Sequence, residues 1–146
     1  MPPPDQLQTG EALGRGIFDS KHVKGAIRGV IPPKVFLEKE GVNDISVDRL
    51  DYADLDQAVA VQSRLRGRPC RGWAKLVLEA AAANGRRVLP DPIPPDQLCH
   101  AYILLPFAQP IAPDKAFIVQ HTHAVELAMK ASWLPAPAIP DEIIST

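Results

Sequence analysis

Two side chains that can move protons lie close together near the middle of the chain. His100 and Tyr102 stand two residues apart in the segment His-Ala-Tyr-Ile-Leu-Leu, whose apolar residues are typical of a strand. Residues two apart on a strand point to the same face, so these two side chains can form a small polar pocket. Histidine is the more ready acid or base, because its ordinary pKa lies near neutrality. The alternative is a half-exposed sheet face carrying two amphipathic side chains.

A second polar block is Ile45-Ser46-Val47-Asp48-Arg49, which alternates with a period of two and predicts a strand. The alternation places Ser46 and Asp48 on one face and Arg49 on the other. Ser46 does not lie in a GxSxG elbow, so its sequence context does not indicate a hydrolase nucleophile. The structural alternative is that Asp48 turns the chain toward the next helix and Arg49 pairs with a nearby acidic residue.

These residues suggest a cleft in which an arginine holds phosphate and His100 transfers protons. The chain would then be a small enzyme acting on a nucleotide or RNA, next to the arginines of residues 64–71. Neither GxGxxG nor GxxxxGK[ST] occurs, so the common phosphate-binding loops are absent. The candidate catalytic residues are Arg28, Ser46, Arg49, His100 and Tyr102.

A local cluster of arginines follows the segment that most clearly predicts a helix. It consists of Arg64, Arg66, Arg68 and Arg71. Such a cluster can bind phosphate or an acidic surface of a partner. The alternative is a solvated helix end, offset by the aspartates at positions 51, 54 and 56.

The remaining histidines and the cysteines do not indicate a metal site. His121 and His123 are two apart on a predicted helix and diverge by about 200°, so they cannot share one metal ion. His123 and Glu126 can share a face, but two ligands do not make a zinc site. Cys70 and Cys99 lack CxxC spacing. We therefore expect no metal and no cofactor.

The prolines and the hydrophobic pattern locate the elements that position these residues. Residues 54–66 predict a helix capped by Asp51 or Asp54 and ended by Gly67 and Pro69. The longest predicted helix covers residues 115–133, with Asp114 as its cap. Strands are expected at residues 45–49, 73–78, 86–89 and 98–105, and two short extended segments, split by Pro32-Pro33, at residues 25–38.

These elements predict a single α+β domain with a small, mostly antiparallel sheet, two main helices and Pro-rich connections. We expect an irregular N-terminal arm at residues 1–24, the domain at residues 25–134 and a Pro-rich tail at residues 135–146. The chain has 16 prolines in 146 residues, about twice ordinary usage, which fits stiff connections.

Composition excludes several classes of function. Sixteen basic residues face 17 acidic ones, so nucleic-acid binding is possible but not indicated by the net charge of −1. Apolar runs stay well short of the roughly 18 residues that a membrane helix needs, so we expect no membrane contact. The first residues have neither a basic region nor an apolar run, so a signal peptide is not indicated and a cytoplasmic location is expected.

From Arg28 to Pro106 the order of motifs resembles a family of small, largely uncharacterised bacterial proteins. The motifs are Arg28-Gly29, Phe36, the Ser-Val-Asp-Arg block of residues 46–49, Gly72-Trp73-Ala74, the proline run of residues 90–95, and the His-Ala-x-Ile-x-Leu-Pro pattern of residues 100–106. The resemblance implies a common domain and leaves the chemistry open.

The predicted long helix carries more apolar residues than one buried face needs. They are Phe117, Ile118, Val125, Met129 and Trp133. With the neutral charge and the lack of a complete catalytic motif, they favour a non-catalytic protein-interaction subunit of the accessory, immunity or antitoxin-like kind, which binds a partner protein. The nucleotide or RNA enzyme is the alternative, so the sequence leaves open whether the chain is an enzyme.

Overall fold

A six-stranded antiparallel sheet forms the centre of the protein, in a computed structural model that describes residues 3–37, 41–108 and 111–137. The strand order is β4-β5-β2-β1-β3-β6. The strands are β1 (Ala12–Ile17), β2 (Asp44–Arg49), β3 (Gly72–Val77), β4 (Arg87–Pro90), β5 (His100–Leu104) and β6 (Ser132–Pro135). The helices are α1 (Ser20–Ile27), α2 (Leu55–Arg66), α3 (Leu78–Ala81) and α4 (Pro113–Lys130), with a 3₁₀ turn η1 (Pro33–Phe36). The predicted α+β class is therefore confirmed.

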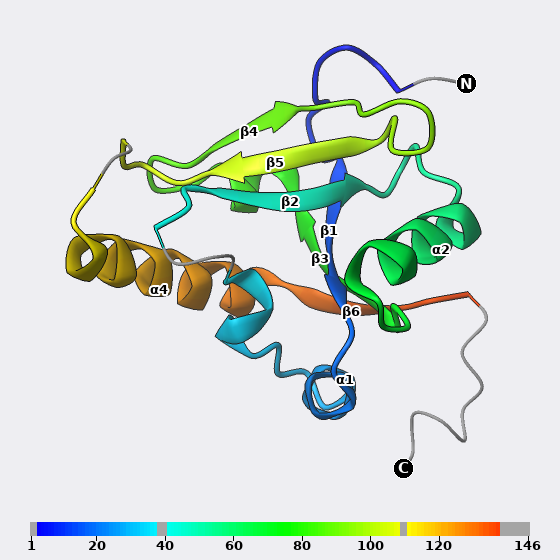
Figure 1. Ribbon diagram of the computed structural model, residues 1–146, viewed down its shortest axis with the longest axis horizontal. Coiled ribbons are helices and arrows are strands. Elements are labelled where there is room, and N and C mark those ends of the chain that lie inside the picture. The colour runs from blue at the N-terminus through cyan, green and yellow to red at the C-terminus, as the bar shows by residue number, and fades with distance from the viewer. Residues whose placement is uncertain (1–2, 38–40, 109–110, 138–146) are drawn as a thin grey trace.

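The sheet bends sharply between β2 and β1. These strands pair only at Leu13–Arg49 and Gly14–Asp48 and then part. In Figure 1, β4, β5 and β2 run across the picture, whereas β1 and β3 run steeply to them. The Arg15 side chain occupies the opening, where it donates from Nη1 to the Ser46 carbonyl at 2.9 Å and from Nε to the Val35 carbonyl at 3.0 Å.

The two faces of the sheet carry cores of different size. On one face, alternate residues such as Leu13, Val47 and Ile103 join a large cluster that also includes side chains of η1 and α4. On the other face, a smaller cluster contains Ala12, Leu50 and Trp73, against which α2 packs. Figure 1 shows α4 below β2 and β5 and α2 beside the far end of β2. Apart from Arg49, the polar residues of β2 and β5 therefore belong to the face that α2 only partly covers.

The strongest sequence patterns predicted their elements well. The Asp54 carboxylate caps α2, accepting from the Gln57 N–H at 3.2 Å, and Gly67 ends the helix with φ +64°. The strands expected at residues 45–49, 73–78, 86–89 and 98–105 correspond to β2, β3, β4 and β5. These segments combine clear periodicity with clear punctuation by Gly and Pro.

Other expectations have to be corrected. Residues 12–17, expected in an irregular arm, form the central strand β1, whose Gly14 and Gly16 hide the alternation. Residues 25–38 contain the end of α1 and the turn η1 instead of two extended segments, because Asp19 caps α1 and Pro33 starts a 3₁₀ turn.

The C-terminal expectations also change. The helix α4 ends at Lys130, and its N-cap is Ala112 without a side-chain bond, so Asp114 lies inside the first turn. Of the predicted Pro-rich tail, residues 138–146 lie outside the described residues. No helix in the described part of the chain is long and apolar enough to cross a membrane.

Candidate functional site

A pocket of about 400 Å³ opens between α2, the ends of β2 and β5, and residues 95–99. Asp48 and His100 form its polar floor, and Tyr52, Val61 and Leu98 are among the residues around it. Asp48 and His100 are directly opposite each other in the β2–β5 register. The next pair along the strands, Arg49 and Cys99, carries the backbone hydrogen bond. Asp48 and His100 are therefore a non-hydrogen-bonded pair, the kind whose side chains lie closer together.

The histidine has a defined tautomer. His100 Nδ1 lies 3.0 Å from the Asp91 carbonyl oxygen and 3.1 Å from Asp91 Oδ2. A carbonyl oxygen only accepts, so Nδ1 carries the proton and the lone pair of the neutral ring is on Nε2. Hydrogen bonds from the described residues do not reach Nε2, although His100 is only 8% exposed. The neutral form of the buried ring therefore presents a free acceptor at the pocket.

The carboxylate of Asp48 is buried beside this ring. Its Oδ2 accepts from the Trp73 indole Nε1 at 3.1 Å, and the Gln62 amide lies 3.4 Å from Oδ1. Burial raises the pKa of Asp48, and the Trp73 hydrogen bond and the nearby His100 lower it by smaller amounts. The protein thus keeps a carboxyl group that is largely buried from water at the floor of an open pocket.

Two free cysteines lie at different depths near this site. Cys99 is half-buried and lines the pocket, and its pKa is raised mainly by burial. Cys70 is 3% exposed, and burial raises its pKa to about 11. Neither thiol is therefore set up as an activated nucleophile.

The predicted catalytic cleft is not assembled. Of the five candidates, all within the described chain, His100 alone lines the pocket. Arg28 is exposed just after α1, and Ser46 pairs with Tyr102 farther along β2 and β5. Arg49 points to the opposite face of the sheet from Asp48, so it cannot serve a cleft that contains His100.

Arg49 has a structural role that explains its burial. Its guanidinium binds Glu11 through two hydrogen bonds of 2.7 and 2.8 Å and donates to the carbonyl oxygens of Pro4 and Gln6 at 2.7 and 3.3 Å. The hydrogen bond with Glu11 raises the pKa of Arg49 further. The pairing predicted for Arg49 is thus confirmed, and it fixes the N-terminal segment against the sheet.

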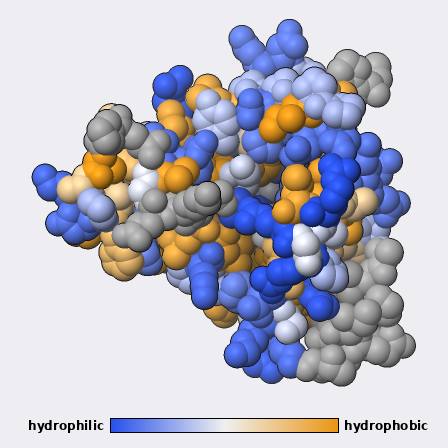
Figure 2. Space-filling view, viewed as in Figure 1, coloured by the Kyte–Doolittle hydropathy of each residue, from blue (hydrophilic) through white to orange (hydrophobic). Residues whose placement is uncertain are grey.

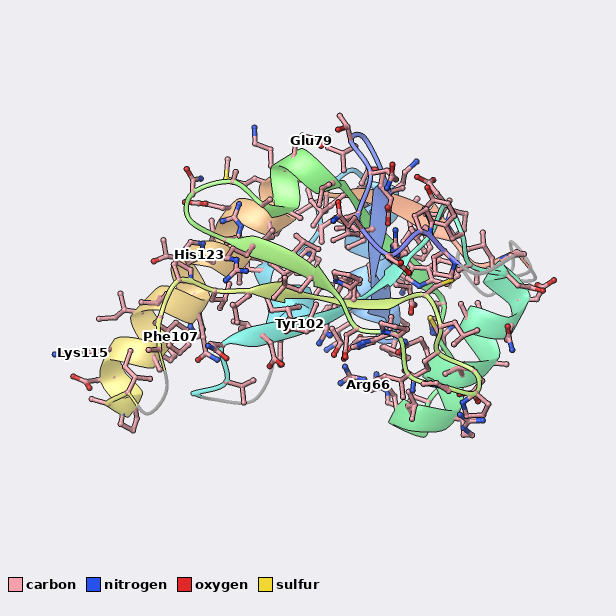
Figure 3. All side chains as sticks on the ribbon, turned by 90° about the horizontal axis from the view of Figure 1, so that it is seen from above. Arg66, Glu79, Tyr102, Phe107, Lys115 and His123 are labelled. Carbon is pink, nitrogen blue, oxygen red and sulfur yellow. The ribbon has the colours of Figure 1, made fainter. Side chains whose placement is uncertain are left out.

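Three residues of the predicted basic cluster, Arg66, Arg68 and Arg71, lie near Phe18 and Asp19, and Arg64 lies apart from them. Arg64 pairs with Asp96 at 2.8 Å, and Arg66 lies over the Phe18 ring. Arg71 donates to the Phe18 carbonyl, whereas Arg68 is exposed. None of these four arginines lines the pocket. Figure 3 shows Arg66 beside α2, far from Lys115, which lies on the other side of the sheet's polar residue Tyr102.

A second candidate site is the outer face of α4, defined here by Phe117, Ile118, His121, Val125 and Met129. The exposed fractions of its apolar residues are 51% for Phe117, 63% for Ile118, 44% for Val125 and 79% for Met129. The rings of Phe117 and His121 stack with centroids 3.8 Å apart. Figure 2 shows orange and tan atoms over this helix. Trp133, expected on the same surface, instead lies half-buried on β6 against the main core.

Sequence reasoning missed three buried charged residues, Glu11, Arg15 and Arg86. Arg86 donates to Glu126 at 2.7 Å and lies 2.8 Å from His123 Nδ1, and it also binds the Ala80 and Ala81 carbonyls. Burial, and then the charge of Arg86, lower the pKa of His123. This network joins the end of α3 to α4, and local sequence does not distinguish such arginines from surface ones.

Within the described ranges, no three His, Cys, Asp or Glu side chains come together as a metal site. Comparison of the chain with protein-family models, with curated proteins and with solved structures finds no match.

Proposed function

We propose that the chain is a protein-interaction subunit, accessory, immunity-type or antitoxin-like, that binds a partner protein through the outer face of α4 in the cytoplasm. One observation carries the proposal. The inner side of α4 is already buried in the core by residues such as Ala124 and Leu127, yet its outer side is also apolar. A second apolar stripe on a helix whose inner side is already buried marks a surface for a partner.

The chemistry of this face describes the surface it would meet. From Phe117 to Met129 it extends about 18 Å along the helix, at about 1.5 Å per residue. Its members carry no carboxylate, ammonium or guanidinium group; Asp114 bounds the face at its N-terminal end, and Lys115, Glu126 and Lys130 lie to one side. The complementary surface is an uncharged apolar groove or helix of a different protein.

The pocket does not favour a nucleotide or RNA enzyme. Such an enzyme needs an arginine beside His100, and the described residues that line the His100 pocket include neither arginine nor lysine.

The test is a pull-down from the native host with matched variants. Val125 on α4 and Val77 on β3 are valines of nearly equal exposure, 44% and 46%. We expect Val125→Glu to weaken binding of the recovered partner at least about tenfold, because the interface would bury a charge, and Val77→Glu to leave it unchanged.

Circular dichroism and thermal unfolding check that both variants fold. The proposal is overturned if both variants lose partner binding equally or both bind the partner equally well. It is also overturned if the pull-down recovers a homodimer instead of a complex, or no stoichiometric partner.

A further inference from the structure

We infer that the pocket between α2 and the β2–β5 floor binds a small organic cation, an amine or a guanidinium compound. This inference is independent of the role of α4, because the pocket lies on the other face of the sheet. It rests on the chemistry of the two buried groups on the floor and on the charges of the pocket wall.

Both floor groups are hydrogen-bond acceptors. When the ring is neutral, His100 Nε2 is an acceptor because Asp91 holds the proton on Nδ1, and the described residues offer Nε2 no donor. The Asp48 carboxylate retains accepting capacity, since one short bond comes from Trp73 and the Gln62 amide is at 3.4–3.5 Å. Two adjacent acceptors, each about nine-tenths buried, are complementary to a ligand group that donates several hydrogen bonds.

The charges of the wall favour the same class of ligand. Asp48, Asp54 and Asp96 line the pocket, and none of its described lining residues is a lysine or an arginine. Arg64 offsets Asp96, and the Gln57 N–H binds Asp54, whereas no lysine or arginine of the described residues forms an ion pair with the Asp48 carboxyl, and among its charged neighbours His100 lowers its pKa the most. A phosphate would meet carboxylates here, whereas a protonated amine or guanidinium would form charge-assisted hydrogen bonds.

The dimensions suit a free small molecule. A pocket of about 400 Å³ falls within the range of roughly 300–1,000 Å³ that is usual for ligand sites. Its sides include apolar groups, among them Val61, Pro95 and Leu98, which can cover the methylene groups of an alkylamine. We therefore expect a flexible or compact cation with a short aliphatic part.

Trp73 provides a direct spectroscopic test, because its indole N–H donates to Asp48. The chain has two tryptophans, and Trp133 faces the main core, so its indole signal is an internal control. We expect agmatine, which carries a guanidinium and an amine, to shift the ¹H–¹⁵N signal of Trp73 in a saturable manner and to leave Trp133 unchanged. Adenosine monophosphate, the anionic probe, is expected to shift neither signal.

Two variants assign the binding to the floor. Asp48→Asn keeps an oxygen acceptor for Trp73 but removes the charge, and we expect it to weaken agmatine binding about tenfold or more. Asp44→Asn is the matched control, since Asp44 lies on the same strand and face but not in the pocket. His100→Asn retains a donor near Asp91, removes the Nε2 acceptor, and should also weaken binding.

Calorimetry of the intact protein gives the affinities, and circular dichroism confirms folding of each variant. An absent Trp73 shift in the wild-type protein overturns the inference without any variant. Saturable binding of adenosine monophosphate, or equal agmatine affinity in Asp48→Asn and Asp44→Asn, overturns it as well.

Discussion

Buried charges in this protein fall into two chemical situations. Arg49 and Glu11 bind each other through two short hydrogen bonds, and two backbone carbonyls accept from the guanidinium of Arg49 as well. Asp48 and His100 instead retain accepting atoms at the pocket floor. A satisfied pair is expected to act in stability, and acceptors with remaining capacity in an open pocket are expected to act in binding.

Removing one partner of the satisfied pair should therefore destabilise the fold strongly. We expect Arg49→Met to lower the free energy of unfolding by about 3–5 kcal/mol, because Glu11 is left as an unpaired buried charge. Arg64→Met is the control, since the Arg64 side chain is 62% exposed and its pair with Asp96 should contribute no more than about 1 kcal/mol. Urea denaturation measures both, and similar losses would contradict the assignment.

The two thiols should react at different rates. A disulfide reagent at mildly alkaline pH is expected to label Cys99 first, because Cys99 is only half-buried and lines the open pocket. Cys70 should react only with unfolding, since it is 3% exposed and its pKa is raised to about 11. Mass spectrometry of timed samples checks the order, and single Cys→Ser variants identify each site. Equal labelling rates would contradict the burial of Cys70.

Asp48 should make stability depend on pH in a particular direction. A folded pKa above the unfolded value means that the native state holds the proton more tightly, so the wild type loses stability as pH rises above 3.8 through the raised pKa. Asp48→Asn lacks this dependence. Its free energy of unfolding should therefore rise relative to that of the wild type over the same pH range.

Urea denaturation at several pH values compares Asp48→Asn with the wild type and with Asp44→Asn, which lies on the same strand. A difference between Asp48→Asn and the wild type that stays constant across the pH range would contradict the raised pKa.

At the scale of elements, sequence predicted best where several local signals agree. The α2 segment has a capping aspartate, a helical pattern and a terminating glycine, and the β2 and β5 segments alternate clearly. The strand β1 escaped prediction because Gly14 and Gly16 interrupt its pattern. Gly14 is required there by packing, since a Cβ would lie 2.7 Å from the Leu50 side chain.

The candidate site was only partly predictable for a related reason. The alternation in β2 and β5 correctly placed Asp48 and His100 on the polar faces of their strands, but it does not reveal which residues of two strands face each other. The register pairs Asp48 with His100 and Ser46 with Tyr102, whereas the alternation alone had already placed Arg49 on the other face. Strand pairing is a long-range property, so the predicted cleft combined residues that the fold separates.

The pairing of β3 with β6 depends on one glycine. A Cβ on Gly72, whose φ is +152°, would collide with the Leu134 carbonyl oxygen and lie 2.6 Å from the Trp133 ring. We expect Gly72→Ala to lower the free energy of unfolding by about 3 kcal/mol. Gly67→Ala, at an open left-handed position, should cost only about 1 kcal/mol. Thermal unfolding compares the two, and equal costs would contradict the close packing of β6.

At the scale of the whole molecule, the unequal cores divide the protein into regions of unequal stability. The side with α4 contains most of the buried apolar residues, whereas the side with α2 relies on Trp73, Leu50 and Ala12. α4 buries six residues and α2 only Val61. Because α2 is also one wall of the pocket, the less stable side is the side to which we assign ligand binding.

Native-state hydrogen exchange should therefore show α2 opening before the rest of the fold. We expect its amides to exchange with an opening free energy at least about 2 kcal/mol below that of α4, because separating α2 exposes little apolar surface. α4 is longer than α2, so a difference in exchange between the two helices can also come from length. Val61→Ala separates the two causes, because it changes the burial of α2 and not its length. Val61→Ala should lower the opening free energy of α2 and leave that of the buried turns of α4 unchanged. If the whole fold opens as one cooperative unit, the variant would lower both opening free energies equally. Uniform protection of α2 and α4 would mean that the small core is as strong as the large one, and the pocket wall would then have to be regarded as rigid.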